Sequence, residues 1–126
     1  MKIPYKNNMN KILVIDDDLE ILEVVQIMLS MNNFNVKAIS NWEEISDKMS
    51  EFKPDLVLLD VSLGGADGRE ICKSMRLSNE TKNVPVILFS ANPEMGKYLD
   101  QCHAQDFIPK PFELSNLVET IKHHVN

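Results

Sequence analysis

The chain has 126 residues, of which 44% are hydrophobic, so it can form one domain with a full apolar core that needs no disulfide or metal for support. Its 13 Lys and Arg residues against 19 Asp and Glu residues give a formal net charge of -6, which argues against a nucleic acid or an anionic membrane surface as the main partner. No apolar core of signal-peptide length opens the chain, and no run approaches the ~18 apolar residues of a membrane helix. Because Cys72 and Cys102 also lack metal-type spacing, we expect reduced thiols and a cytoplasmic location.

Apolar runs and helical repeats alternate along the chain after residues 1–10, a polar segment that we expect to be flexible. The apolar runs predict strands at residues 12–15, 34–39, 56–60, 84–89 and 106–108. Apolar residues spaced by three and four positions predict helices at about 18–31, from 41 through 49, at about 69–77, from 92 through 102 and at about 113–124. Five strands alternating with five helices predict one α/β domain over 11–126, with a parallel sheet covered on both faces.

The helical spacing also indicates which side chains should face the sheet. These are Leu19, Leu22, Val25, Met28 and Leu29 in the first helix; Trp42, Ile45 and Met49 in the second; Ile71, Met75 and either Cys72 or Leu77 in the third; and Leu114, Leu117, Val118 and Ile121 in the last. Gly96 should weaken the fourth helix locally, because glycine is a poor helix former.

Polar side chains follow four of the five predicted strands at the point where each strand ends. They are Asp16 and Asp17 after the first strand, Asp60 after the third, Ser90 after the fourth and Lys110 after the fifth. Because the carboxyl ends of strands in a doubly wound sheet share one edge, we expect these side chains to meet there. Clustered carboxylates favour a hard cation with oxygen ligands such as Mg²⁺. A metal, an ammonium group and a hydroxyl around a carboxylate are suited to phosphoryl transfer, with Asp60 as the nucleophile.

Each of these residues also has a simpler interpretation. Asp17 and Asp18 could merely favour the positive start of the helix at Leu19, and Lys110 could be a solvated loop lysine. Asp60 could be a turn residue and Ser90 a loop hydroxyl. His103, His123 and His124 lie at helix ends, where we expect solvated roles and no metal ligation. A single shared site explains the polar residues at all four strand ends, whereas the simpler interpretations require four independent coincidences.

Four segments resemble the receiver domain of two-component response regulators. They are ILVIDDD at 12–18, LVLLDVSLGGADG at 56–68, VPVILFSAN at 84–92 and DFIPKPF at 106–112. The resemblance covers nearly the whole chain and implies a flavodoxin-like fold with strand order 2-1-3-4-5 over residues 11–126. It also implies a stand-alone signalling domain that assists only its own phosphorylation and dephosphorylation.

The resemblance assigns a role to each residue of the strand-end cluster. Asp16 and Asp17 would form the acidic pocket, in which Asp17 and Asp60 bind Mg²⁺ together with the backbone carbonyl of Ser62. Asp60 would accept a phosphoryl group from a phosphohistidine on a sensor kinase or a phosphotransfer protein.

Further implied roles concern the switch that follows phosphorylation. Ser90 and Lys110 would contact the phosphoryl oxygens, and Phe107 would turn inward when Ser90 is drawn to the phosphate. The Lys110-Pro111 bond would be cis and help to aim the lysine. The output surface would comprise the fourth helix, last strand and fifth helix, with Lys97, Asp100 and Lys122 on it, and would bind a downstream protein or a second copy of the chain.

Two positions depart from the family pattern, and two more lie where the family itself varies. Gly64 stands where the family usually has proline, so the loop after Asp60 should be looser. Phe107 lacks the hydroxyl of the commoner tyrosine, so the switch would depend on packing alone. Ser62 and Asn92 occupy positions that vary in the family and tune phosphate lifetime.

Two other classes fit part of this pattern. A haloacid-dehalogenase-like phosphohydrolase would use Asp16, Asp18, Ser90 and Lys110, but it would leave Asp60 without a role and would need a later acidic pair and a threonine or valine where Glu20 stands. A receiver-like docking module that is never phosphorylated would usually lack an acidic residue, the nucleophile or the lysine, and all of these are present here. A flavodoxin is excluded because no Gly/Ser/Thr-rich phosphate loop follows the first strand.

Overall fold

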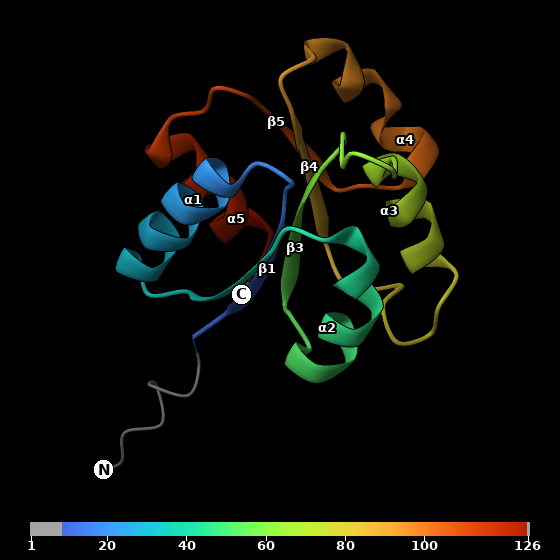
Figure 1. Ribbon diagram of the computed structural model, residues 1–126, viewed down its shortest axis with the longest axis horizontal. Coiled ribbons are helices and arrows are strands. Elements are labelled where there is room, and N and C mark those ends of the chain that lie inside the picture. Colours follow the sequence, from blue (N-terminus) through green and yellow to red (C-terminus); the bar gives the residue numbers. More distant parts are fainter. Residues whose placement is uncertain (1–8, 126) are drawn as a thin grey trace.

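A computed structural model describes residues 9–125, so most of the N-terminal segment that we expect to be flexible lies outside the described residues. Its centre is a five-stranded parallel sheet with strand order β2-β1-β3-β4-β5, as the resemblance implies (Figure 1). The strands are β1 (Lys11–Ile15), β2 (Asn35–Ile39), β3 (Leu56–Asp60), β4 (Val86–Ser90) and β5 (Asp106–Pro109). The helices are α1 (Leu19–Met31), α2 (Ile45–Phe52), α3 (Gly68–Arg76), α4 (Leu99–Cys102) and α5 (Leu114–His124), with 3-10 turns η2 (Trp42–Glu44) and η3 (Pro93–Tyr98).

Two apolar layers hold the helices on opposite faces of the sheet (Figure 1). Alternate residues of β1 point to opposite faces, so Ile12 and Val14 pack with α1 and α5, whereas Leu13 and Ile15 pack with α2, α3 and α4. All five residues of β3 and of β4 are buried, which explains the run of four apolar residues that begins each strand. Burial on both faces places the ends of these strands rigidly.

Helix ends account for the side chains whose burial was predicted wrongly. Leu19 is 68% exposed and Leu114 38% exposed, and each is the first residue of its helix. Trp42, which opens η2, is also exposed. Of the two alternatives for α3, Cys72 is the buried one, and Leu77, which follows the last residue of the helix, is exposed. In α1 and α5 the buried stripe therefore begins about one turn inside the helix, at Leu22 and at Leu117.

The fourth helix forms only in part. Asn92 caps its start through a 3.0 Å hydrogen bond from the Glu94 N–H, but residues Pro93–Tyr98 form the tighter 3-10 turn and only Leu99–Cys102 are α-helical. Gly96 lies in the 3-10 segment, where its low helix propensity is consistent with the interruption. Within residues 9–125, no helix is long and apolar enough to cross a membrane.

Candidate phosphoryl-transfer site

The carboxyl edge of the sheet brings together the polar side chains that follow the strands. Nζ of Lys110 lies 2.7 Å from Oδ2 of Asp16 and 3.5 Å from Oδ2 of Asp60, although these residues come from three different strand ends. Carboxylate oxygens of Asp16, Asp17 and Asp60 all lie within 4.8 Å of one another. The prediction that these side chains meet at one edge is therefore confirmed.

Burial and like charge together make Asp60 an unusual carboxylate. Asp16 is fully buried and Asp60 is only 5% exposed. The pKa of Asp60 is raised to about 6, first because burial disfavours the charged form and then because the Asp16 carboxylate repels it, whereas Lys110 acts in the opposite direction. The Lys110 ammonium group thus only partly offsets the effects of burial and of the Asp16 charge on Asp60.

The donor set of this cluster fits a hard divalent cation. Three carboxylates offer oxygen ligands, and Asp17 is exposed, which leaves one side of the cluster open to water. The loop after β3 starts at this cluster, since the Ser62 N–H donates to Oδ1 of Asp60 at 3.4 Å. Mg²⁺ prefers a few carboxylates together with water molecules, so the residues present match that ion better than zinc.

Ser90 and Lys110 approach the cluster from neighbouring strands. Ser90 is the last residue of β4 and is 6% exposed, and its Oγ accepts a 3.0 Å hydrogen bond from the Asn92 N–H. The Lys110 N–H donates to the Ser90 carbonyl at 2.8 Å, and the Lys110-Pro111 bond is cis. A hydroxyl and an ammonium group therefore lie at the same edge as Asp60.

Phe107 is in β5 and lies against η3, on the face of the sheet that α2, α3 and α4 cover. Its ring is half-buried and contacts Gly96, where an added Cβ would lie 3.2 Å from Cδ2 of the ring. The sequence predicted Phe107 as a switch residue but did not reveal that a glycine makes room for its ring.

Two further features of the site are clear only in three dimensions. Asp18 caps α1, with its Oδ1 accepting from the Glu20 N–H at 3.0 Å, so its role is the simpler one considered above. Asp67 and Arg69 form an ion pair of 2.7 Å at the start of α3, next to the loop that follows Asp60. Their spacing of two residues is not a recognisable sequence signal, which is why this pair was not predicted.

A cavity of about 350 Å³ opens beside Asp60, between the loop after β3 and the loop after β4. It is lined by Ser62 and Ser90, by Asn92 and Met95, and by the Asp67 and Arg69 pair, among others. The residues that vary in the resembled family, Ser62 and Asn92, thus form part of its walls.

Comparison with known proteins gives a consistent result. The family described as the response regulator receiver domain matches residues 12–122. The chain is 30% identical over 114 residues to the response regulator MprA of Mycolicibacterium vanbaalenii, a match that covers 89% of this chain and 48% of MprA. The chain therefore spans about half the length of that curated relative.

Solved structures show the same architecture. A putative response regulator from Chloroflexus aurantiacus superimposes with a TM-score of 0.86 at 27% identity, covering 91% of this chain and 96% of that one. The BeF3-activated N-terminal receiver domain of RstA from Klebsiella pneumoniae gives a TM-score of 0.83 at 26% identity, with coverage of 91% and 97%.

Proposed function

The chain belongs to the response regulator receiver domain family, and from this premise we propose that it accepts a phosphoryl group on Asp60 within a two-component or phosphorelay system. The domain is a signalling module and not a conventional enzyme. Its donor would be a phosphohistidine on a sensor histidine kinase or on a phosphotransfer protein. The observation that carries the proposal is the placement of Lys110 against both Asp16 and Asp60 at the edge where three carboxylates converge.

In the proposed reaction an Asp60 oxygen attacks phosphorus. The O–P bond forms while the P–N bond to the donor imidazole breaks, and the imidazole leaves with the bonding electrons. Attack requires the ionised carboxylate, and a pKa of about 6 leaves Asp60 mostly ionised at neutral pH. Lys110 offsets the charge on the phosphoryl oxygens, and the Ser90 hydroxyl can donate to one of them once it turns from the Asn92 N–H.

Mg²⁺ would be held by Asp17, Asp60 and the Ser62 backbone carbonyl, with Asp16 completing the acidic pocket. When bound, it neutralises carboxylate and phosphoryl charge, so that an anionic donor can approach. The cluster of three carboxylates and the raised pKa of Asp60 support this assignment, because burial and the Asp16 charge both disfavour the ionised form of Asp60 and a divalent cation favours it.

Phosphorylation would then bias a surface toward a partner. We expect Ser90 to be drawn to the phosphoryl group and Phe107 to move inward from Gly96, changing the surface of α4, β5 and α5. Lys97, Asp100 and Lys122 are exposed on these elements or beside them, so they are available to a downstream protein or to a second copy of the chain. Cys72 and Cys102 are buried and lie outside any disulfide of the described residues, which supports the proposed cytoplasmic location.

The experiment is incubation with acetyl phosphate and Mg²⁺, followed by intact mass measurement of the wild-type protein and of Asp60→Asn. We expect wild type alone to gain the mass of one phosphoryl group. Equal labelling of both proteins, or of neither, contradicts the assignment of Asp60. Steady release of phosphate from varied small esters would instead favour a phosphohydrolase.

A further inference from the structure

The loop after Asp60, residues 61–67, is closed upon itself by backbone hydrogen bonds. The Gly68 N–H donates to the Val61 carbonyl at 2.7 Å and the Leu63 N–H donates to the Ala66 carbonyl at 3.1 Å. Ser62 also pairs with Asp67 as an isolated antiparallel bridge. The two ends of the loop are thus held together, and Asp67 is the residue that closes it.

The tip of this loop is intrinsically permissive. Gly64 and Gly65 adopt positive φ angles of 52° and 133°, conformations that glycine reaches readily and that leave the unfolded loop a large conformational freedom. Gly64 also lies against Asp17, because an added Cβ would be 3.0 Å from Oδ2 of that carboxylate. A shift of the loop at Gly64 would therefore change the contacts of the Asp17 carboxylate.

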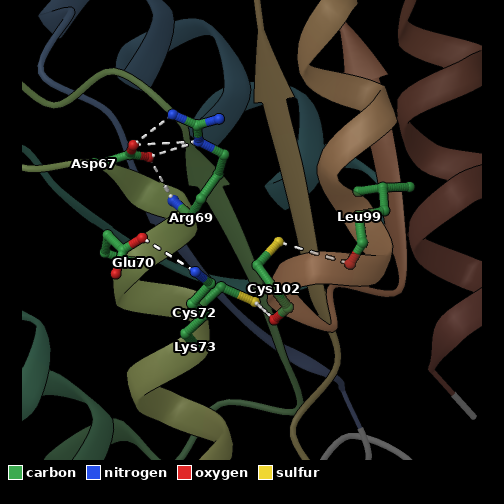
Figure 2. A network of polar contacts seen from close by, with 7 residues as sticks. All are labelled: Asp67, Arg69, Glu70, Cys72, Lys73, Leu99 and Cys102. Atoms are coloured by element: carbon green, nitrogen blue, oxygen red, sulfur yellow. Dashed lines mark hydrogen bonds and ion pairs between the residues drawn. The ribbon is translucent and has the colours of Figure 1, made fainter.

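Arg69 holds the end of the loop through Asp67. The Asp67 carboxylate accepts a hydrogen bond from the Arg69 backbone N–H at 2.8 Å. It also accepts hydrogen bonds from Nε of Arg69 at 3.1 Å and from Nη2 at 2.7 Å (Figure 2). Hydrogen bonds from Arg69 are the first cause of the lowered pKa of Asp67. This fork of parallel bonds fixes the orientation of the carboxylate as well as its charge.

The same helix carries a useful contrast. Lys73 and Glu70, also shown in Figure 2, form an ion pair of 3.3 Å through one nitrogen, and both side chains are largely exposed. Such a pair contributes little and fixes no geometry. The Asp67 and Arg69 pair is less exposed, at 35% and 29%, and makes several bonds.

We propose that Arg69, acting through Asp67, is a positioning residue that holds the loop of residues 61–67 in the conformation in which Asp17, Asp60 and the Ser62 carbonyl bind Mg²⁺. The inference rests on the proposed function. Gly68 packs so closely against the Asp60 carbonyl that a side chain has no room there, so the start of α3 and the end of β3 form one packed unit. The Asp67–Arg69 clamp joins the loop to that unit, and it supplies the restraint that a loop with two glycines lacks.

The sign of one substitution separates this role from simple electrostatics. Arg69→Gln removes a cation near the site, and electrostatics alone would then strengthen Mg²⁺ binding. Loss of the clamp would weaken binding, because the loop must be ordered again when the ion binds. Asp67→Asn keeps an oxygen for the α3 cap but loses the ion pair, so the clamp predicts weaker binding for both variants.

The test is a Mg²⁺ titration of wild type, Arg69→Gln, Asp67→Asn, Arg69→Lys and the control Lys73→Gln. The fluorescence of Trp42, the one tryptophan of the chain, reports on the loop, since an added Cβ on Gly65 would lie 3.4 Å from its Nε1. Amide NMR shifts of residues 62–65 give an independent measure. Thermal unfolding of each variant shows that it is folded at the titration temperature.

We expect the dissociation constant for Mg²⁺ to rise by up to about tenfold in Arg69→Gln and Asp67→Asn, the lower end of the range for residues that orient metal ligands. Arg69→Lys should be intermediate, because it keeps the charge without the fork, and Lys73→Gln should match wild type. Unchanged or tighter binding in Arg69→Gln would overturn the proposal, even if its melting temperature falls. Failure of wild type to bind Mg²⁺ would instead overturn the proposed function itself.

Discussion

The two ends of the sheet treat polar groups in opposite ways. At the amino end, the guanidinium of Arg76 in α3 donates to neutral acceptors. These are the carbonyls of Thr81, Lys82, Val84 and His103 and the side-chain oxygen of Gln105. Gln105 in turn accepts the first N–H of β4, from Val86, at 2.7 Å. At the carboxyl end, three carboxylates of like charge lie close together, and two of them, Asp16 and Asp60, share one lysine.

This difference separates stability from reactivity within one small fold. Arg76 satisfies backbone groups where α3 ends and where β4 and β5 begin, so its contacts strengthen the framework. The buried carboxylates around Asp60 destabilise the folded state, yet they favour binding of the cation on which the proposed reaction depends. Replacing Arg76 should therefore cost stability without slowing phosphorylation, whereas replacing Asp60 should raise stability and abolish phosphorylation.

The largest effect is expected from Lys110→Met, which keeps an apolar side chain over the Phe89 ring but removes the ammonium group. It leaves the fully buried Asp16 carboxylate without its 2.7 Å partner, and we expect unfolding free energy to fall by about 3 kcal/mol, as for other broken buried pairs. Urea denaturation at pH 7.5 measures this, with the exposed Lys82→Met as control. Equal stability of the two variants would show that the carboxyl end is not held by this lysine.

Arg76→Ala should follow, with a loss of about 2 kcal/mol, because several carbonyls lose a charged donor and regain only water. The same urea titration measures the loss, and Lys73→Ala on the same helix is the control. Folded Arg76→Ala should still be phosphorylated by acetyl phosphate at the wild-type rate. A slowed reaction in the fully folded variant would remove the distinction between the two ends.

Asp60→Asn should raise the unfolding free energy of the metal-free protein by about 1 to 2 kcal/mol at pH 7.5. The raised pKa of Asp60 limits this gain to about 3 kcal/mol. The unfolded carboxyl titrates near 3.8 and the folded one near 6, so wild type loses stability relative to Asp60→Asn as the pH rises between these values. Below pH 4 the gain should shrink toward zero. Denaturation of both proteins in EDTA across this pH range measures the difference in stability. A difference that does not change with pH would contradict the raised pKa of Asp60 as its cause.

The smallest effect is expected at Gly64, whose φ of 52° disfavours a side chain. Gly64→Ala should cost about 1 kcal/mol through backbone strain and should also weaken Mg²⁺ binding, because its Cβ crowds Asp17. Gly64→Asn separates the two causes, since asparagine tolerates this conformation but keeps the Cβ. We expect it to recover stability and not Mg²⁺ affinity, as measured by melting temperature and by Mg²⁺ titration. Recovery of both would show that crowding of Asp17 has no effect.

The sheet and the meeting of Asp60 with its neighbours followed from local patterns and one topological rule. Apolar runs that end at carboxylates identified β1 and β3, and parallel strands align their carboxyl ends by construction. The Arg76 network and the Asp67–Arg69 clamp could not be predicted in this way. Arg76 contacts the His103 carbonyl 27 residues away, and carbonyls carry no sequence signal. Exposure of Leu19 and Leu114 depends on where each helix begins relative to the sheet, which periodicity alone does not specify.

The most direct test of the account locates the phosphoryl group chemically. After incubation with acetyl phosphate, borohydride reduces an acyl phosphate to the alcohol, so that a phosphorylated aspartate is recovered as homoserine in peptide mass spectra. We predict conversion at position 60 alone, and only when Mg²⁺ was present during the incubation. Conversion at Asp16 or Asp17, or conversion at Asp60 that is equally efficient in EDTA, would contradict the claim that crowded carboxylates and a divalent cation make Asp60 the acceptor.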